Sequence, residues 1–438
     1  MNLFKKIKLK LIEIGLNNLI KLSLLLNFPV LTSFLFNLAA GSVGHGSYTV
    51  LCLGRSIFTD DIKALVTYSG QIKYRILHLR YLDMLLNWFI PPAERRELTE
   101  NNYHVSKIGE LGRQKCYTYL TRMLPSLLKF MDLQAVISGN FGYIQQQELA
   151  RVCQDQAVPF IVLHKEGMAI VGAFDNYVEQ YRQHKFIGAK MLLYNEQIRN
   201  AMLKIKIEGL FENKMEVVGI PRLDSCFLER NYHPSAKQIT FFSFYPRDKF
   251  HYLITDQKII DAIADRSAEF HKLVIEFAQK HPEYQVIIKT KVAEHYVSYV
   301  TDIVNAHFAV KPQNLLIINV GEPADLVKES VAVLGFNSTT LIEAMVANRL
   351  IISPYMGDII TDIPWDYFTH YPELVNYARN YQELEEYILN YQKYLKHHNQ
   401  QRENKFLEEL IYTPDGRASE RTEQAIINAI KNYAPQRK

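Results

Sequence analysis

The stretch Gln134-Ala-Val-Ile-Ser138 decides the fold, together with the residues that follow it as far as Leu163. This apolar run is followed by the turn Gly139-Asn-Phe-Gly142, by helical periodicity over Ile144–Gln154 and by a second apolar run over Val158–Leu163. Short apolar runs predict buried strands, and a helix between two of them makes a βαβ unit. We therefore expect a parallel sheet covered by helices on both faces.

The same alternation continues on both sides of a polar stretch, Glu229–Ala236, which predicts the boundary between two halves. In the first half we expect the strand Ala189–Tyr194, the helix Asn195–Glu208 and the strand Met215–Gly219. In the second half we expect strands at Gln238–Phe244, Gln285–Lys289, Asn314–Ile318, Ser330–Leu334 and Leu350–Ser353, with helices at Asp256–Lys280 and Thr340–Ala347. The chain before Ala135 looks mostly helical, with weak strand signals at Tyr48–Leu53 and near Ala64, and long helices follow Pro354.

A chain of 438 residues exceeds what one hydrophobic core usually organises, which favours two domains with a cleft between them. We predict an α/β fold of two Rossmann-like domains, with parallel sheets facing one another across the cleft and helical segments at both ends of the chain. The predicted domains are a helical N-terminal segment over 1–45, a first Rossmann-like domain over 46–230, a second over 231–415 and a C-terminal helix over 416–438.

The charge of the chain is concentrated near its N-terminus. The net charge of +4 is too even to favour nucleic acid as a partner, but residues 1–21 carry five lysines against one glutamate. The apolar stretch Leu22–Ala40 follows. It is compatible with a buried helix pair broken at Pro29, an amphipathic anchor at a membrane surface or a transmembrane span.

The cysteines indicate the compartment. The four cysteines lie far apart without zinc-ligand spacing, which fits a reducing cytoplasm.

Ligands of open parallel sheets bind beyond the carboxyl ends of the strands, so the residues that follow each strand are the candidates for a site. Five such clusters are rich in polar side chains: His164–Gly167, Ile220–Asp224, Tyr245–Asp248, Lys289–Lys291 and Phe336–Thr340. The run Ser338-Thr-Thr340 predicts a helix N-terminus, whose free amides attract a phosphate, although such residues often only cap a helix. Glu343 has two interpretations, a ribose contact or a capping box with Thr340.

Two motifs carry a family resemblance. Val218-Gly-Ile-Pro-Arg-Leu-Asp224 and Phe336-Asn-Ser-Thr-Thr-Leu-Ile-Glu-Ala344 resemble motifs of the GT-B glycosyltransferases of bacterial surface polysaccharide (capsule and O-antigen) biosynthesis. The resemblance extends from about Gln134 to Gly357 and implies an acceptor domain followed by a nucleotide-sugar domain. It also implies that no cofactor and no metal are needed.

Within that group the chain looks most like the Kdo transferases that use CMP-Kdo, because His164-Lys-Glu-Gly167 is similar to a loop of their acceptor domain. This resemblance implies CMP bound near Ser338–Thr340 and Lys289. Many relatives have a Lys/Arg-Pro-His-Pro turn where this chain has Lys289-Thr-Lys291, so that phosphate contact does not carry over.

Transfer from an anomeric carbon needs a carboxylate as base or nucleophile, and Glu166 and Asp224 are placed to supply it. Ion pairs of Glu166 with Lys165 and of Asp224 with Arg222, or a helix cap at Asp224, are the structural alternatives. The predicted catalytic residues are thus Asp224 and Glu166, and His164, Lys165 and Gly167 are predicted on the acceptor side. The predicted donor-binding residues are Arg222, Ser243, Tyr245, Arg247, Lys289, Lys291, Asn337, Ser338, Thr339, Thr340 and Glu343.

The predicted function is transfer of a sugar from a nucleotide donor to a surface polysaccharide or glycolipid. The expected partners are that donor, a glycan or lipid-linked glycan, and the cytoplasmic face of the inner membrane, without nucleic acid. Two alternatives remain open: a CDP-glycerol or polyol-phosphate transferase, and a non-catalytic scaffold that binds a glycan.

Overall fold

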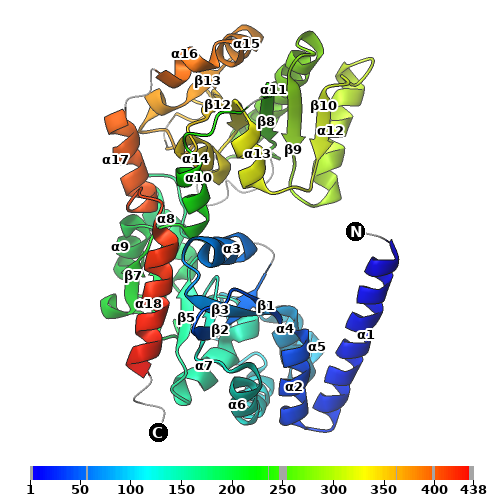
Figure 1. The fold of residues 1–438 in the computed structure, drawn as a ribbon, viewed down its shortest axis with the longest axis vertical. Coiled ribbons are helices and arrows are strands. Elements are labelled where there is room, and N and C mark those ends of the chain that lie inside the picture. The colour runs from blue at the N-terminus through cyan, green and yellow to red at the C-terminus, as the bar shows by residue number, and fades with distance from the viewer. Residues whose placement is uncertain are drawn as a thin grey trace. The chain divides into compact units, whose positions relative to one another are not determined.

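The chain folds into two compact units, each built around its own sheet (Figure 1). The computed structural model describes residues 3–55, 58–234, 236–245, 254–361, 363–396 and 400–433. The first unit comprises Met1–Gly167, Val178–Arg222 and Arg417–Lys438, and the second comprises Met168–Tyr177 and Leu223–Gly416. The chain leaves the first unit just after Gly219, whose φ of 86° is a left-handed conformation that favours glycine.

The first unit holds a seven-stranded sheet in the order β1-β3-β2-β4-β5-β6-β7. All neighbouring strands are parallel except the short edge strand β1, which runs antiparallel to β3. The apolar side chains of β2, β4 and β5 are buried because helices cover both faces. The strands are β1 (Gly41–Val43), β2 (Tyr48–Gly54), β3 (Ile72–His78), β4 (Ala135–Ser138), β5 (Phe160–Leu163), β6 (Lys190–Leu193) and β7 (Met215–Val217).

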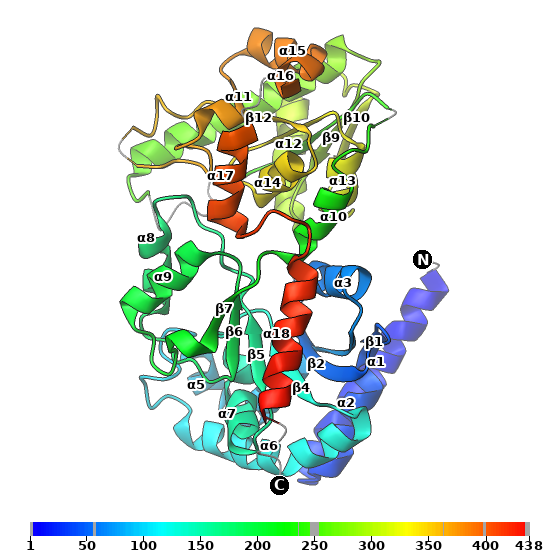
Figure 2. The same cartoon turned by 60° about the vertical axis from the view of Figure 1, so that its left-hand side comes forward.

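The helices of the first unit come from its three chain segments, and the last of them is the C-terminal helix (Figure 2). They are α1 (Leu3–Leu25), α2 (Pro29–Ala39), α3 (Thr59–Tyr68), α4 (Arg80–Phe89), α5 (Pro92–Glu97), α6 (Glu110–Met131), α7 (Gln147–Asp155), α9 (Glu196–Ile205) and α18 (Ala418–Tyr433). The short α8 (Phe174–Val178) begins in the segment that belongs to the second unit.

The second unit holds a six-stranded, fully parallel sheet in the order β10-β9-β8-β11-β12-β13. Numbered from its own first strand, this is the 3-2-1-4-5-6 order of dinucleotide-binding sheets. Its core packs Phe241, Phe270 and Phe277 with the aliphatic side chains of the strands. The strands are β8 (Gln238–Phe242), β9 (Gln285–Lys289), β10 (Leu315–Ile318), β11 (Ala332–Gly335), β12 (Leu350–Pro354) and β13 (Asn376–Ala378).

The helices of the second unit flank that sheet and include α11, the longest helix among the described residues. They are α10 (Asp224–Leu228), α11 (Gln257–Lys280), α12 (Glu294–His307), α13 (Pro323–Glu329), α14 (Thr339–Val346), α15 (Tyr381–Leu389), α16 (Tyr391–Lys396) and α17 (Gln400–Ile411).

The predicted α/β fold class with two Rossmann-like domains is confirmed by the two parallel sheets. That the sheets face one another across a cleft stays a prediction. The strand signal near Ala64 was wrong, because this segment is helix α3, whose first turn carries Asp60 and Asp61. Strands β1, β3 and β13 were not predicted from the sequence.

The apolar stretch Leu22–Ala40 is divided between the end of α1 and the whole of α2, with a turn at Leu26–Phe28 between them. Asn27 in this turn has a φ of 48°, which ends α1. In the described part of the chain, no helix combines the length and the apolar character that crossing a bilayer requires.

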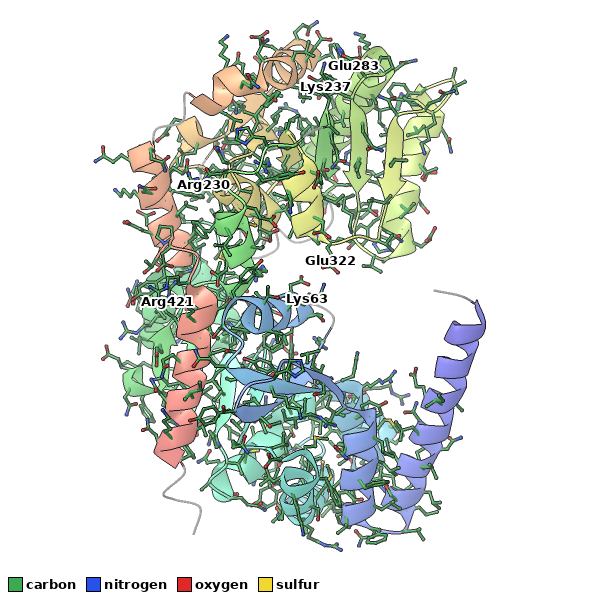
Figure 3. The ribbon with its side chains drawn as sticks, in the orientation of Figure 1. Lys63, Arg230, Lys237, Glu283, Glu322 and Arg421 are labelled. Atoms are coloured by element: carbon green, nitrogen blue, oxygen red, sulfur yellow. The ribbon has the colours of Figure 1, made fainter. Side chains whose placement is uncertain are left out.

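Helix α18 is tied to the first sheet by buried polar contacts. Arg421, labelled in Figure 3, donates from Nε to the Val218 carbonyl at 3.0 Å. Glu423 is fully buried, and its two oxygens accept from the Gln71 amide at 2.7 Å and the Tyr74 hydroxyl at 2.9 Å. Buried donors left without a partner are costly, so Glu423 stabilises the start and the middle of β3.

Replacing Glu423 with alanine is expected to lower the free energy of unfolding by about 3 kcal/mol, because the Gln71 amide and the Tyr74 hydroxyl lose their buried acceptor. Urea unfolding followed by circular dichroism measures the change. Glu420→Ala, on the same helix but half exposed and paired with the exposed Arg417, is the matched control and should change stability by less than about 0.5 kcal/mol. Equal effects of the two variants would contradict the role of Glu423.

Candidate functional site

The second sheet has its switch point between β8 and β11, adjacent strands whose chain connections depart in opposite directions. Ser243, Phe244 and Tyr245 follow β8, and Phe336, Asn337 and Ser338 follow β11. In a sheet of this order the crevice beyond these two strand ends is the place where ligands bind. Most of the predicted donor residues fall at this edge or at the neighbouring end of β9.

Asn337 and Ser338 form the turn into α14. Asn337 has a φ of 47°, and its Oδ1 is buried without a hydrogen-bond partner among the described residues. Ser338 is the N-cap, with its Oγ accepting from the Thr340 amide at 3.3 Å and lying 2.7 Å from the Thr340 Oγ1. The first-turn amides of a helix have no partner within it, so this end favours an anion. A buried acceptor and an anion-attracting helix end therefore stand side by side.

The cap also decides between the two interpretations of Glu343. Because Ser338 is the N-cap, Thr340 is already inside the helix, and Glu343 is not in the third position that a capping box requires. The capping-box interpretation of Thr340 and Glu343 was therefore wrong. Glu343 is buried, with 7% of its surface exposed, and Thr339 opens the helix beside it. The ribose contact of Glu343 stays a prediction.

Ser243 is held by a buried histidine on α11. The His271 Nδ1 lies 2.7 Å from the Ser267 carbonyl oxygen, which only accepts, so Nδ1 carries the proton. Its Nε2 must then accept the Ser243 hydroxyl at 2.8 Å. Burial lowers the pKa of His271 to about 4, which keeps the ring neutral. The Ser243 oxygen consequently offers lone pairs to a ligand, which suits a ribose hydroxyl or a base N–H better than a phosphate.

The two predicted lysines, Lys289 and Lys291, lie at the carboxyl end of β9. Lys289 donates from Nζ to the carbonyls of Thr290 at 2.8 Å and Asn319 at 3.3 Å, and burial lowers its pKa. The Lys291 Nζ lies 5.2 Å from the ring centroid of Tyr296. Tyr245 packs edge-on against Tyr299 at 5.2 Å between ring centroids. The remaining predicted donor residue, Arg247, lies outside the described residues.

The first sheet has its own switch point between β2 and β4, and a charged cluster lies at the carboxyl ends of these strands and of β5. Arg55 directly follows β2, and its guanidinium carbon lies 4.2 Å from the ring centroid of Tyr143, which comes after β4. Glu166 follows β5 in a loop fixed by the Lys165 amide, which donates to the Gly139 carbonyl at 2.9 Å. The predicted acceptor residue Gly167 is fixed as well, since its carbonyl accepts from Asn195 at 3.2 Å.

Glu100 completes this charged cluster, and the sequence did not single it out. Burial, and then the negative charge of Glu166, raise the pKa of Glu100, while Arg55 opposes the shift. The same charge of Glu166 raises the pKa of Tyr143 further than burial alone does. We name Arg55, Glu100, Tyr143 and Glu166 the acidic cluster. Two carboxylates beside one guanidinium, with the pKa of Glu100 raised, are suited to proton transfer.

A box of aromatic rings lies behind the acidic cluster. The box consists of the rings of His164, Phe141, Tyr181 and His184. The centroids of five pairs of these rings lie between 5.2 and 5.6 Å apart. Neither nitrogen of His164 or of His184 has a hydrogen-bond partner among the described residues. Burial lowers the pKa of His164 to about 3, and it also lowers the pKa of His184. The predicted acceptor residue His164 is thus a neutral, fully enclosed ring.

The box explains the need for a glycine in the turn after β4. A Cβ at Gly142 would lie 2.9 Å from the His184 Nε2 and 3.3 Å from the Glu100 Oε2. The backbone of this turn therefore passes between the box and the acidic cluster.

Arg222 and Asp224, from the motif that ends the first unit, have different surroundings. Arg222 donates from Nη1 to the Tyr194 hydroxyl at 3.0 Å and lies 3.6 Å from the buried Asp61. Tyr194 in turn donates to the Asp61 Oδ2 at 3.0 Å. Asp224 begins α10 in the second unit with 1% of its surface exposed. Arg222 thus lies beside Asp61, and its ion pair with Asp224 stays a prediction.

A groove of about 340 Å³ in the second unit lies at the other edge of its sheet, where β11 and β12 begin. Tyr232, Tyr391 and Arg349 line it. The Arg349 guanidinium is engaged with the carbonyls of Lys328 and Ala347 at 3.1 and 2.8 Å, so it supports the local backbone. Within the described ranges, no three His, Cys, Asp or Glu side chains are grouped to hold a metal ion.

Comparisons with known proteins give similarity of fold only. No protein-family model matches the sequence, and no curated protein matches it. A UDP-GlcNAc 2-epimerase from Neisseria meningitidis, solved with UDP-GlcNAc, is 13% identical with a TM-score of 0.49, covering 87% of this chain and 100% of that one. A variant of the wall teichoic acid polymerase TagF is 12% identical with a TM-score of 0.48, covering 94% and 96%.

A trehalose 6-phosphate synthase from Burkholderia multivorans is 9% identical with a TM-score of 0.43, covering 90% of this chain and 99% of that one.

The enclosed His164 predicts a loss of stability in acid. Its pKa of about 3 in the folded chain lies below the ordinary value of 6.5, so the unfolded chain binds more protons between these values. The free energy of unfolding should therefore decrease as the pH is lowered below 6.5. His164 contributes at most about 1.4 kcal/mol of this decrease per pH unit.

His164→Phe keeps an aromatic ring in the box and removes this titration. Between pH 6.5 and 5 the variant should lose about 2 kcal/mol less stability than the wild type in urea unfolding. The control is His307→Phe, at an exposed position on α12, which should follow the wild-type curve. Parallel pH curves for the wild type and His164→Phe would contradict the neutral, buried ring.

Proposed function

We propose that the chain is a nucleotide-sugar-dependent glycosyltransferase of GT-B type. The observation that carries the proposal is the acidic cluster at the carboxyl edge of the first sheet, in a chain whose second sheet has the strand order of a nucleotide-binding domain. The first unit supplies a base for the acceptor, and the second unit binds the activated donor. Asp224 remains a predicted catalytic carboxylate, but the local geometry favours Glu166 with Glu100.

The second unit supports donor binding through three groups at its switch point. The N-terminal end of α14 attracts the phosphate, and the buried Asn337 Oδ1 accepts a hydrogen bond. The Ser243 oxygen, whose proton is held by His271, accepts another. Together they offer one anion site and two acceptors, which matches a phosphate linked to a ribose or a base.

The first unit supports activation of an acceptor hydroxyl. In the proposed step the hydroxyl oxygen forms a bond to the anomeric carbon of the sugar, and its proton passes to the carboxylate of Glu166. The bond from the anomeric carbon to the phosphate oxygen breaks, and the nucleotide leaves with the electron pair. Burial and the charge of Glu166 raise the pKa of Glu100, so Glu100 is the second candidate to accept the proton.

We propose CMP-Kdo as the first donor to test, because the sequence resembles Kdo transferases at His164–Gly167 and Phe336–Ala344. The proposed acceptor is a surface polysaccharide or lipid-linked glycan at the cytoplasmic face of the inner membrane. No cofactor or metal is part of the proposed reaction. A CDP-glycerol transferase would use the same helix end for its donor phosphate, so the donor panel includes CDP-glycerol.

Glu166→Gln is expected to lower kcat by roughly a hundredfold or more while leaving the donor Kd within about twofold, because the amide keeps the size of the side chain but cannot accept the proton. Release of CMP, which transfer from either CMP-Kdo or CDP-glycerol would leave, measures kcat, and calorimetry with free CMP measures Kd. Glu212→Gln, at an exposed carboxylate of the same unit that pairs with Arg199, is the control and should behave as the wild type.

The donor panel and the second unit separate the alternatives. Asn337→Ala combined with Ser338→Ala should weaken nucleotide binding without changing the folded state seen by circular dichroism. If CDP-glycerol is consumed and CMP-Kdo stays intact, the Kdo proposal is wrong and the polyol-phosphate alternative holds. If nucleotides bind but no donor turns over, or if Glu166→Gln keeps full activity, the chain is not a transferase of this mechanism.

A further inference from the structure

An apolar and basic surface covers helices α1, α2 and α6 of the first unit. Large apolar side chains of α1, of α2 and of the turn between them stand in solvent, including Leu22 at 46%, Leu26 at 61%, Phe34 at 44% and Leu38 at 61% exposed. Soluble proteins expose single apolar residues freely, but contiguous groups of them mark an interaction surface. We call the exposed residues of these three helices the hairpin surface, after the α1–α2 hairpin visible in Figure 1.

The apolar residues follow the helical repeat and continue from one helix to the next. Leu19 and Leu22 of α1 are three residues apart, and Leu26 follows four residues later in the turn. Val30, Phe34 and Leu38 of α2 are four apart, so they share one helix face. The Phe34 ring packs edge-on against Phe130 of α6, with centroids 6.0 Å apart, and Phe130 is itself 39% exposed. The apolar character therefore extends from α2 onto α6.

A groove of about 350 Å³ opens between α1, α4 and α6. Its apolar lining comes from Leu24, Phe89, Leu111 and Tyr119, and Lys115 and Arg122 stand in the same lining. Arg122 also donates to Asn27 at 3.2 Å, in the turn between α1 and α2. An apolar trough with two cations in its wall is complementary to a molecule with a hydrocarbon part and an anionic head.

The charges of these helices have one sign. Lys115, Arg122 and Lys129 are seven residues apart along α6, which puts them on one face of that helix. The sequences of α1 and α6 together contain nine lysines and arginines against Glu13 and Glu110. Glu13 is paired with Arg80 of α4, which neutralises it. Two copies of this surface would bring like charges together, so it is unsuited to self-association.

We propose that the hairpin surface docks the protein on an anionic phospholipid bilayer. The exposed side chains of α1 and α2 enter the boundary between headgroups and acyl chains, and Lys115 and Arg122 hold lipid phosphates at the groove. This inference goes beyond sugar transfer and does not depend on it, since it rests on contacts within the first unit alone.

Vesicle co-sedimentation of the full chain tests the proposal with phosphatidylcholine vesicles that contain or lack phosphatidylglycerol. Binding to the anionic vesicles should be at least roughly tenfold tighter and should weaken in high salt. The apolar variant Leu22→Glu/Leu26→Glu/Phe34→Glu and the charge variant Lys115→Glu/Arg122→Glu should each weaken that binding by roughly tenfold or more. Both change exposed positions only, so their thermal unfolding should match the wild type.

The matched control is Val310→Glu/Lys311→Glu in the second unit, which makes the same kinds of change at exposed positions away from the three helices. It should bind as the wild type does. Equal binding to both kinds of vesicle, or unchanged binding of the apolar variant, would overturn the proposal. So would a wild-type dimer in sedimentation velocity that the apolar variant dissociates, since the surface would then be a subunit interface. Donor turnover measured without vesicles separates this outcome from a failure of the transferase proposal.

Discussion

Parallel pairing of the strands is the constraint on which the acidic cluster of the first unit and the switch-point residues of the second unit both depend. In a parallel sheet every strand runs in the same direction, so every loop that leaves a strand begins at the same edge. Arg55, Tyr143 and Glu166 are far apart in the sequence, yet they follow three adjacent strands of the first sheet and meet there. The second sheet uses the same rule to bring Ser243 and Asn337 to the two strands at its switch point. Backbone hydrogen bonds between the strands thus bring the candidate side chains together, whatever contacts those side chains then make.

Burial then determines the protonation state of the groups at these edges. His271 and His164 are enclosed, and both stay neutral because a charged ring would lose its hydration. For His271 the cost is offset by hydrogen bonds at both nitrogens, and the result is a serine oxygen with a fixed orientation. Glu100 and Glu166 are only partly buried, so their charges still act on one another. The first unit can therefore hold, within one cluster, a carboxyl group whose pKa is raised by the charge of its neighbour.

The sequence predicted the continuous apolar strands well and the amphipathic ones poorly. Ala135–Ser138 and Phe160–Leu163 are buried along their whole length, so composition alone identifies them. Strand β3 mixes buried and partly exposed residues, with Lys73 and Arg75 among them. The sequence therefore predicted no strand there and assigned this region to helices. Glu100 gave no signal, because it lies in a loop after the short helix α5 rather than after a strand. Its role depends on the tertiary approach of that loop to Gly142, which no local pattern encodes.

The exposure of the apolar side chains on α2 follows from buried hydroxyl groups on its other face. Thr32 lies 2.7 Å from the Ser23 hydroxyl of α1 and also contacts the Tyr119 hydroxyl of α6, and Ser33 donates to the Met123 carbonyl at 2.9 Å. Rotating α2 to bury Phe34 would break these hydrogen bonds and leave several polar groups without partners in an apolar interface. Directional contacts therefore fix the orientation of the hairpin, whereas apolar packing alone would favour turning these residues inward. The chain keeps hydrophobic side chains in solvent at the expense of stability, and such an arrangement is explained when a membrane supplies the missing apolar surroundings.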